Sequence, residues 1–518
     1  MHRRSFLRWA GVAGTTVVVG RYFAGRGHAE AFGEAPPGSE TALLPPARRV
    51  KRVLEVFLYG GLSPWESLYL VRAYGKPDDP QHPNSQYYAF DHDASGGIRA
   101  ASRRCGLPDG ADIGQPFATD ELGAQVELGP FARRLWDRPD VTGRMRLVVQ
   151  RHRLEPHEAA VPQALTGRPV GQPAAAGLGA HVQRYFADRD PGERSSPWSF
   201  VFATGGVSAD NVSAAAATGV HPATARPLLI KIDNADAFVR QLDRTAVRTA
   251  PGAGADSVAA YDDLLRGYVD DYGRRLSWPE HGPVRARRFT DLAIATGTVA
   301  RHQAIAGVLT PELFTRRPGT ACALSRQTDV PGMSLEAARH LLTHPGEPAR
   351  YVCVSDIGLS EASGGGGYDT HEDNSDDQSR NFDNVLRSLL AIINAPGEQD
   401  PRKLSLDDTL IILNTEFGRT PWAQDEGSGR NHHPYGYTTA FIGGTITAAE
   451  RGIHGAIGPD GDALASAATP AENRIAALLG LGIWPFSPEA FAVSDVPGAG
   501  TEVDAARLVT QRVLGVTL

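Results

Sequence analysis

The chain has 518 residues, 41% of them hydrophobic, which is enough to bury a large core and by length allows two to four domains. Its formal net charge is −7, and this acidic balance argues against nucleic acid as a partner, because nucleic-acid binding needs a basic face. Three cysteines, Cys105, Cys322 and Cys353, allow at most one disulfide, so cysteine does not organise the fold.

Residues 1–29 resemble a twin-arginine export signal. The segment RRSFL (3–7) precedes a mildly apolar run at 9–20, and small residues follow near Ala29. The run is too short and too rich in Gly and Thr to span a membrane, and a basic disordered tail is the alternative. The leader holds five Arg and no acid, which leaves 47 basic against 59 acidic residues and a net charge of −12. We therefore expect export through the twin-arginine machinery, no stable membrane span, and a soluble protein that is periplasmic or secreted.

Residues 30–49, rich in Pro, Gly and Ala, are predicted to form a linker to a body at 50–518. Apolar, β-branched runs predict strands at 53–59, 141–150, 198–203, 227–232, 350–355, 409–413 and 438–443. Helical spacing predicts helices at 158–165, 256–276, 284–308, 334–342, 379–393, 471–481 and 503–514. Polar residues 76–120 are predicted to be surface loop, and a helical block at about 234–344 is predicted to be an insertion. Strands that alternate with helices predict an α/β fold with a doubly wound, mostly parallel sheet and helices on both faces.

Carboxylates and imidazoles follow two of these predicted strands. Asp369 and His371 come after a four-glycine run. Glu416 follows the strand at 409–413, and the pair His432 and His433 comes later. Because the carboxyl ends of parallel strands meet at one edge of a sheet, we expect these side chains to lie close together. Such groups are normal ligands of zinc and other divalent ions, although each motif alone is also typical of a solvated loop. The sequence therefore predicts a metal site.

His157 is the other candidate for chemistry, because it stands at the first turn of the predicted helix at 158–165. Backbone N–H groups and the helix dipole favour an anion there. Neutral imidazole could attack an ester directly, bind a metal, or serve as a general base toward a water on that metal. A buried histidine that merely satisfies its hydrogen bonds is the structural alternative, and the sequence leaves these roles open.

Two arginines are candidates for holding an anionic substrate. The guanidinium groups of Arg419 and Arg168 match phosphate or sulfate oxygens in two-point contact. A salt bridge to a neighbouring acid is the alternative use of each. The first predicted strand breaks at Gly60-Gly61, which allows either a close backbone approach to a ligand or a plain turn.

Six motifs then occur in a fixed order. They are GGLS (60–63), LTGR (165–168), YDTHED (368–373), TEFGRTP (415–421), GRNHHP (429–434) and FIGG (441–444). Together they resemble the DUF1501 family of exported bacterial proteins, which is similar to the alkaline phosphatase and sulfatase superfamily. The resemblance spans about residues 50–515, and EFGRTP followed by GRNHH is its most specific part.

The resemblance implies an alkaline phosphatase-like domain that holds one or two divalent ions, which could be Zn, Mn, Fe, Ca or Mg. Asp369 and His371 match the Asp/His pair of one metal, and Glu416 takes the place of the acid at the next strand's end. His432 or His433 matches the late histidine ligand.

Other positions depart from the superfamily pattern. Phe417 stands where a histidine usually follows the acid, and Glu66 stands where DUF1501 members often have Asp, so Glu66 is kept as a candidate ligand. In sulfatases, a Cys or Ser nucleophile lies near the start of the helix that ends in Leu-Thr-Gly. In this sequence His157 stands at that place. A single-metal site and an altered pair both stay open, and Ser63 and Arg168 are expected to contact substrate.

The implied function is an exported metal-dependent hydrolase of phosphate or sulfate esters, acting on a small anionic ester or a sulfated or phosphorylated glycan. His157 and Arg419 would be its catalytic residues. The rival is a non-catalytic envelope or glycan-binding protein that keeps the fold, and the missing Ser, Thr or Cys favours it.

Overall fold

A computed structural model provides the structure of the chain. It describes residues 32–74, 103–106, 111–171, 175–189, 199–204, 227–232, 329–346, 348–359, 366–422, 424 and 429–518, together with 212, 214–217, 260, 263, 264, 267 and 313. The predicted export signal at 1–29 and most of the predicted helical insertion at 234–344 lie outside these residues; the end of the insertion, 329–344, is described.

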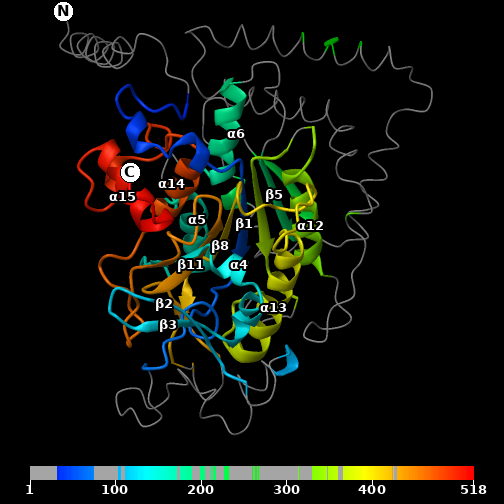
Figure 1. Cartoon of the computed structure of the whole chain (residues 1–518), viewed down its shortest axis with the longest axis vertical. Coiled ribbons are helices and arrows are strands. Elements are labelled where there is room, and N and C mark those ends of the chain that lie inside the picture. Colours follow the sequence, from blue (N-terminus) through cyan, green and yellow to red (C-terminus); the bar gives the residue numbers. More distant parts are fainter. Residues whose placement is uncertain are drawn as a thin grey trace, which may run out of the picture.

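An eight-stranded sheet forms the centre of the fold (Figure 1). Its spatial order is β12 (Gly452–His454), β4 (Met145–Gln150), β11 (Tyr437–Gly443), β8 (Thr409–Asn414), β1 (Arg52–Leu58), β7 (Tyr351–Asp356), β5 (Ser199–Thr204) and β6 (Leu228–Ile232). Every neighbouring pair is parallel except the two made by β11, which runs antiparallel to β4 and to β8. The predicted α/β class with a mostly parallel sheet is confirmed.

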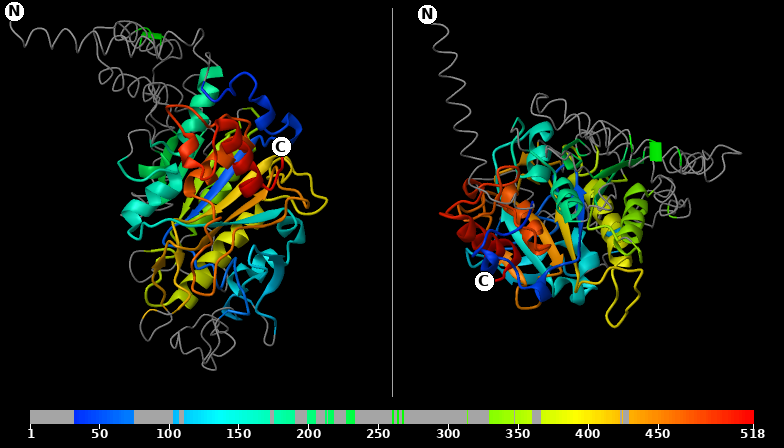
Figure 2. Two further views of the ribbon diagram at one scale, coloured as in Figure 1. Left: turned by 90° about the vertical axis from the view of Figure 1, so that its left-hand side faces the viewer. Right: turned by 90° about the horizontal axis from the view of Figure 1, so that it is seen from above.

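Helices cover both faces of this sheet, as Figure 2 shows. One face packs against α5 (His157–Thr166), α6 (Leu178–Arg189), α14 (Pro470–Gly480) and α15 (Glu502–Leu514). The other packs against α12 (Val330–Leu342), α13 (Asn374–Ala391), η4 (Pro130–Ala132), α3 (Arg133–Trp136) and α4 (Pro139–Thr142). The central strands are therefore buried on both sides; all six residues of β8 are buried. No described helix combines the length and apolar character that crossing a membrane requires.

Smaller elements complete the described chain. Two hairpins pair β2 (Gln115–Thr119) with β3 (Gln125–Leu128) and β9 (Gly418–Arg419) with β10 (His432–His433). The 3-10 turns are η1 (Glu40–Ala42), η2 (Pro46–Arg48) and η7 (Val493–Asp495).

Four sequence predictions need correction. The described part of the predicted linker, 32–49, packs onto the body, because its apolar side chains Ala42 and Leu44 are fully buried. The predicted loop at 76–120 contains β2, and the predicted strand at 141–150 begins only at Met145, after α4. Helix α13 starts at residue 374 rather than 379, because the Asp373 carboxylate caps it by accepting from the Asp376 N–H at 2.9 Å.

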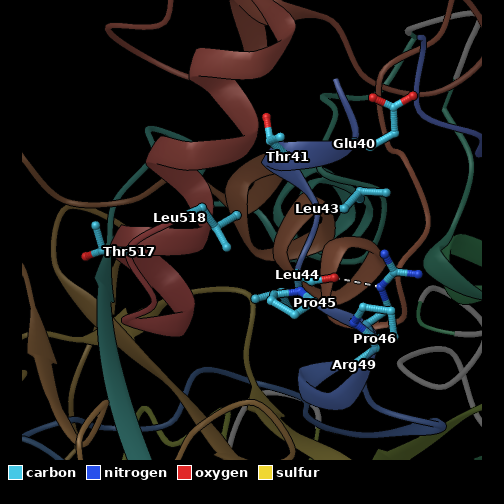
Figure 3. A pocket seen from close by; sticks show the side chains of 9 residues that line it. All are labelled: Glu40, Thr41, Leu43, Leu44, Pro45, Pro46, Arg49, Thr517 and Leu518. Carbon is cyan, nitrogen blue, oxygen red and sulfur yellow. Dashed lines mark hydrogen bonds between the residues drawn. The ribbon is translucent and has the colours of Figure 1, made fainter. Parts of the chain in front are cut away.

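A surface hollow lies beside the first described segment and the last two residues of the chain (Figure 3). Its lining residues are Glu40, Thr41, Leu43, Leu44, Pro45, Pro46, Arg49, Thr517 and Leu518. The Arg49 Nε–H donates to the Leu44 carbonyl across 2.8 Å. Arg49 comes just before β1, so the hollow lies at the edge where β1 begins, opposite the edge where the parallel strands end.

Candidate metal centre

Four side chains converge where the parallel strands end. His157 begins α5 after β4, Asp369 and His371 follow β7, and His432 precedes the antiparallel β11. Ligand atoms of His157, Asp369 and His432 all lie within 4.8 Å of one another. Asp369 Oδ1 is 3.0 Å from His371 Nε2 and 3.3 Å from His432 Nε2, and its Oδ2 is 3.3 Å from His157 Nε2. The two Nε2 atoms of His371 and His432 are 3.1 Å apart.

Glu416 fixes the tautomer of His157. Its Oε1 lies 2.8 Å from His157 Nδ1, and since an ionised carboxylate only accepts, Nδ1 carries the proton. Nε2 of His157 is buried and makes no hydrogen bond of good geometry to any described residue. In the neutral ring this atom holds a lone pair aimed at Asp369. A carboxylate behind a histidine, with the opposite nitrogen free, is the usual arrangement of a metal-binding imidazole.

His371 shows the same arrangement. Its Nδ1 lies 2.8 Å from Gln424 Oε1, so the amide oxygen accepts the proton and leaves Nε2 as the donor atom that faces Asp369 and His432. His157, Asp369 and His432 could therefore hold a divalent ion, and His371 Nε2 lies beside two of them. A nitrogen-rich set suits Zn, Fe or Mn better than Ca or Mg, which prefer oxygen ligands.

Charge at the centre follows from these contacts. Burial alone would raise the pKa of Asp369, but its contacts with His157, His371, His432 and Arg419 outweigh burial and hold that pKa far below its usual range. Burial lowers the pKa of His157, but Asp369 and Glu416 more than reverse the effect and raise it to about 9 in the metal-free protein. A metal ion must therefore compete with a proton for His157.

Glycines let the loop after β1 approach this centre. Gly60 has φ +111°, and a Cβ there would lie 2.1 Å from the Asp369 nitrogen, so only glycine fits. The Gly60 N–H donates to Glu416 Oε1 at 2.8 Å. Gln378 of α13 then ties this loop to the one that carries Asp369: it accepts from the Ser63 N–H at 2.8 Å and donates to the carbonyls of Gly61 and Tyr368, each at 2.9 Å.

Only one residue of the His432–His433 pair faces the centre. The two form β10, and successive side chains of a strand point to opposite faces. His433 turns away, with its Nε2 2.9 Å from the Gly461 carbonyl and its ring 5.5 Å from that of Tyr435. The sequence had left both histidines as candidates, and the strand geometry selects His432.

Arg419 is buried, and its guanidinium donates to groups of the protein rather than to an exposed anion. Its Nη2 donates to Asp369 Oδ1 at 2.6 Å and to the Gly60 carbonyl, and its Nη1 donates to the Arg430 carbonyl at 2.9 Å. The remaining Nε–H reaches the Gly61 carbonyl at 3.3 Å. These contacts differ from the expected role of holding substrate, because the guanidinium orients Asp369 and the glycine loop instead.

Three more predicted site residues lie outside the cluster. Glu66 is fully buried, with one carboxylate oxygen paired to Arg430 and the other accepting from the Ser63 hydroxyl, which accounts for both Glu66 and Ser63. Arg168 follows the far end of α5, where it binds Asp495 at 2.8 Å and covers the Phe491 ring. Sequence order alone could not exclude these residues, because each stands beside a motif that does reach the centre.

Sequence reasoning missed several residues that support the centre. His152 Nε2 donates to the Glu416 carbonyl at 2.6 Å, since its Nδ1 accepts from the Leu154 N–H at 3.0 Å. Rings of Tyr59 and Phe417 pack on His157 with centroids 5.1 and 5.0 Å away. The one available signal was position: His152 precedes His157 in the same segment after β4, and Tyr59 ends the β1 run.

The residues that converge from β7 to β11 lie in a segment with a family match. Residues 349–481 match DUF1501, described as a protein of unknown function. This match supports the DUF1501 family. Asp369, His371, Glu416 and His432 fall within the matched segment, whereas His157 lies before it. The chain matches no curated protein and no solved structure.

Proposed function

We propose that the chain is a metal-dependent hydrolase that holds one divalent ion between His157, Asp369 and His432, with His371 as a further ligand. One observation carries this proposal: the buried Nε2 of His157, its proton held on the other nitrogen by Glu416, faces a carboxylate and a second imidazole at ligand distance. Zinc, iron or manganese fits the donor set best.

When bound, such an ion supplies Lewis acidity, which polarises an ester oxygen and lowers the pKa of a water molecule. The chain's own residues hold the geometry. Glu416 orients His157 and makes its ring a stronger donor, and Arg419 keeps the Asp369 carboxylate in place. The contacts with the three histidines and Arg419 hold the pKa of Asp369 far below its usual range, so the carboxylate can also accept a hydrogen bond from an incoming water.

An alkaline phosphatase-like fold is part of the proposal. The support is the order of the six motifs together with a mostly parallel sheet whose carboxyl edge bears the centre. Phe417 stands where the superfamily usually has a histidine, and Glu66 is paired with Arg430. Both observations favour a single ion over a pair. The resemblance to that superfamily implies phosphate or sulfate esters as the substrate class.

Export to the periplasm or the exterior is also proposed. It is supported by the twin-arginine pattern at 1–29 and by Cys105, which is disulfide-bonded, since disulfides persist in oxidising compartments. Among the described residues, Cys353 is a free cysteine and is buried in β7.

Metal analysis of the purified full-length protein tests the proposal. We expect about one equivalent of a transition metal, lost in Asp369→Ala and in His432→Ala but retained in the adjacent control His433→Ala. If the protein carries no divalent ion and Asp369→Ala changes nothing, the proposal is wrong. If the ion is present but acetyl, phosphate and sulfate esters of 4-nitrophenol are all stable, the non-catalytic envelope or glycan-binding protein is the better reading.

A further inference from the structure

We propose that the substrate presents an uncharged carbonyl, in a carboxylic ester or an amide, and that the substrate molecule is neutral or cationic. This inference rests on the proposed hydrolase function and narrows its substrate class. It departs from the phosphate or sulfate esters that the family resemblance implies.

The arginines closest to the centre are already engaged. Arg419 is fully buried, with its donors directed at Asp369 and at three backbone carbonyls. Arg430 is buried as well, paired with Glu66 and bonded to the Thr420 carbonyl at 2.9 Å. Tetrahedral anions are normally clamped by guanidinium, ammonium or several N–H donors, and neither arginine is directed at an exposed ligand.

The described segment that carries Asp369 and His371 is acidic. Residues 366–377 hold five Asp or Glu, Asp369 included, and no Lys or Arg, and Asp376 among them is paired with Arg104 and Arg380. Glu372 and Asp373, immediately after the ligand His371, are exposed. These carboxylates raise the local cation concentration and oppose the approach of an anion.

Two further arginines precede His157 but lie with the side of β10 that faces away from the centre. The Arg151 Nη1 donates to the Ala463 carbonyl at 3.3 Å. The charge of Arg153 acts to lower the pKa of the Tyr435 hydroxyl, which donates to Glu155 at 2.9 Å. The Tyr435 ring meets the His433 ring edge-on. Neither guanidinium is therefore directed at the centre.

Aromatic rings among the described residues also border the ligands. Tyr59 and Phe417 pack on the His157 ring, and Phe417 also lies 4.5 Å from the His432 ring centroid. A carbonyl needs only one Lewis-acid contact at its oxygen, so it suits a centre with a single ion and apolar walls. In the hydrolysis, the water oxygen bonds to the carbonyl carbon and the bond to the leaving oxygen or nitrogen breaks. One water proton ends on the leaving group, and the other is released from the new carboxylic acid.

Binding to the metal-loaded full-length protein tests this inference without relying on turnover. Calorimetry at low salt would compare inorganic phosphate, sulfate and acetohydroxamic acid, a carbonyl compound that binds metals. We expect the hydroxamate to bind at least about tenfold more tightly than either anion. In parallel, kcat/KM for 4-nitrophenyl acetate should exceed that for the phosphate and sulfate esters.

A charge reversal next to the centre provides the matched control. Glu372→Lys should tighten phosphate binding severalfold at low salt, and less so at high salt, because it removes the local repulsion. Asp407→Lys, 83% exposed and placed just before β8 at the opposite sheet edge, should leave both affinities unchanged. Tighter binding of phosphate or sulfate than of the hydroxamate, or no hydroxamate binding at all, would overturn the inference. Absence of the metal would instead overturn the hydrolase proposal, and it is measured before any ligand is added.

Discussion

Glu416→Gln separates the charge of Glu416 from its shape. In the native protein Oε1 lies 2.8 Å from His157 Nδ1 and accepts the Gly60 N–H at 2.8 Å, and the residue is fully buried. A glutamine oxygen can keep both contacts, so the variant removes the negative charge and little else. Carboxylates behind metal ligands typically contribute 10- to 100-fold to metal affinity. We therefore expect a loss of about 10- to 100-fold, which corresponds to about 1.4–2.8 kcal/mol.

Competition for zinc against a chromophoric chelator measures this loss directly. Asp383→Asn is the matched control, because Asp383 of α13 is a buried carboxylate that pairs with Arg134 of α3 and does not contact a candidate ligand. It should leave zinc affinity within about twofold, and circular dichroism should show both variants folded. Equal affinities for Glu416→Gln and the native protein would refute the assigned role, because His157 would then need no carboxylate behind it.

Three other predictions concern stability. In the metal-free protein the pKa of His157 is raised from 6.5 to about 9, so its protonation stabilises the fold fully below pH 6.5. That contribution, about 3 kcal/mol, is lost as pH rises to 9, and urea unfolding that showed rising stability over this interval would contradict it. Gly60→Ala should cost more than about 1 kcal/mol and weaken zinc binding, since its Cβ would collide with the Asp369 backbone; unchanged affinity would count against the close approach. Arg474→Met should cost about 3–5 kcal/mol in chemical unfolding because it strands the buried Glu55, and the Glu55→Leu/Arg474→Met double variant should recover most of this; additive losses would argue against the pair.

The sheet could be predicted because its strands are apolar on both faces. The run predicted at 409–413 is β8 at 409–414, and the run predicted at 350–355 is β7 at 351–356. Burial on both sides requires continuous apolar segments, and such segments are visible without any partner. The antiparallel direction of β11 was not visible, because a buried strand carries no mark of its direction.

The candidate centre was only partly predictable for a related reason. The strand ends showed which residues could meet at one edge, and Asp369, His371 and His432 do meet there. Which residue is a candidate ligand and which supports a ligand depends on contacts between distant segments. Glu416 resembled a ligand but holds His157 from behind, and Arg419 resembled a substrate clamp but is enclosed by backbone carbonyls. Residue type and strand position are the same for either role, so only the packing distinguishes them.

A buried chain of hydrogen bonds explains how distant strands hold this geometry. On the face covered by α14, Glu55 of β1 accepts from Tyr351 of β7 at 2.6 Å and from Asn414 of β8 at 2.9 Å. Thr439 of β11 donates to Asn414 at 3.2 Å and accepts from Gln150 of β4 at 2.6 Å. These five strands are neighbours in the sheet, and each contributes one polar side chain. A slip of one residue would turn any of these side chains to the other face of the sheet. This series of hydrogen bonds therefore fixes the strand registers. The ligand positions therefore depend on buried residues that never touch the centre.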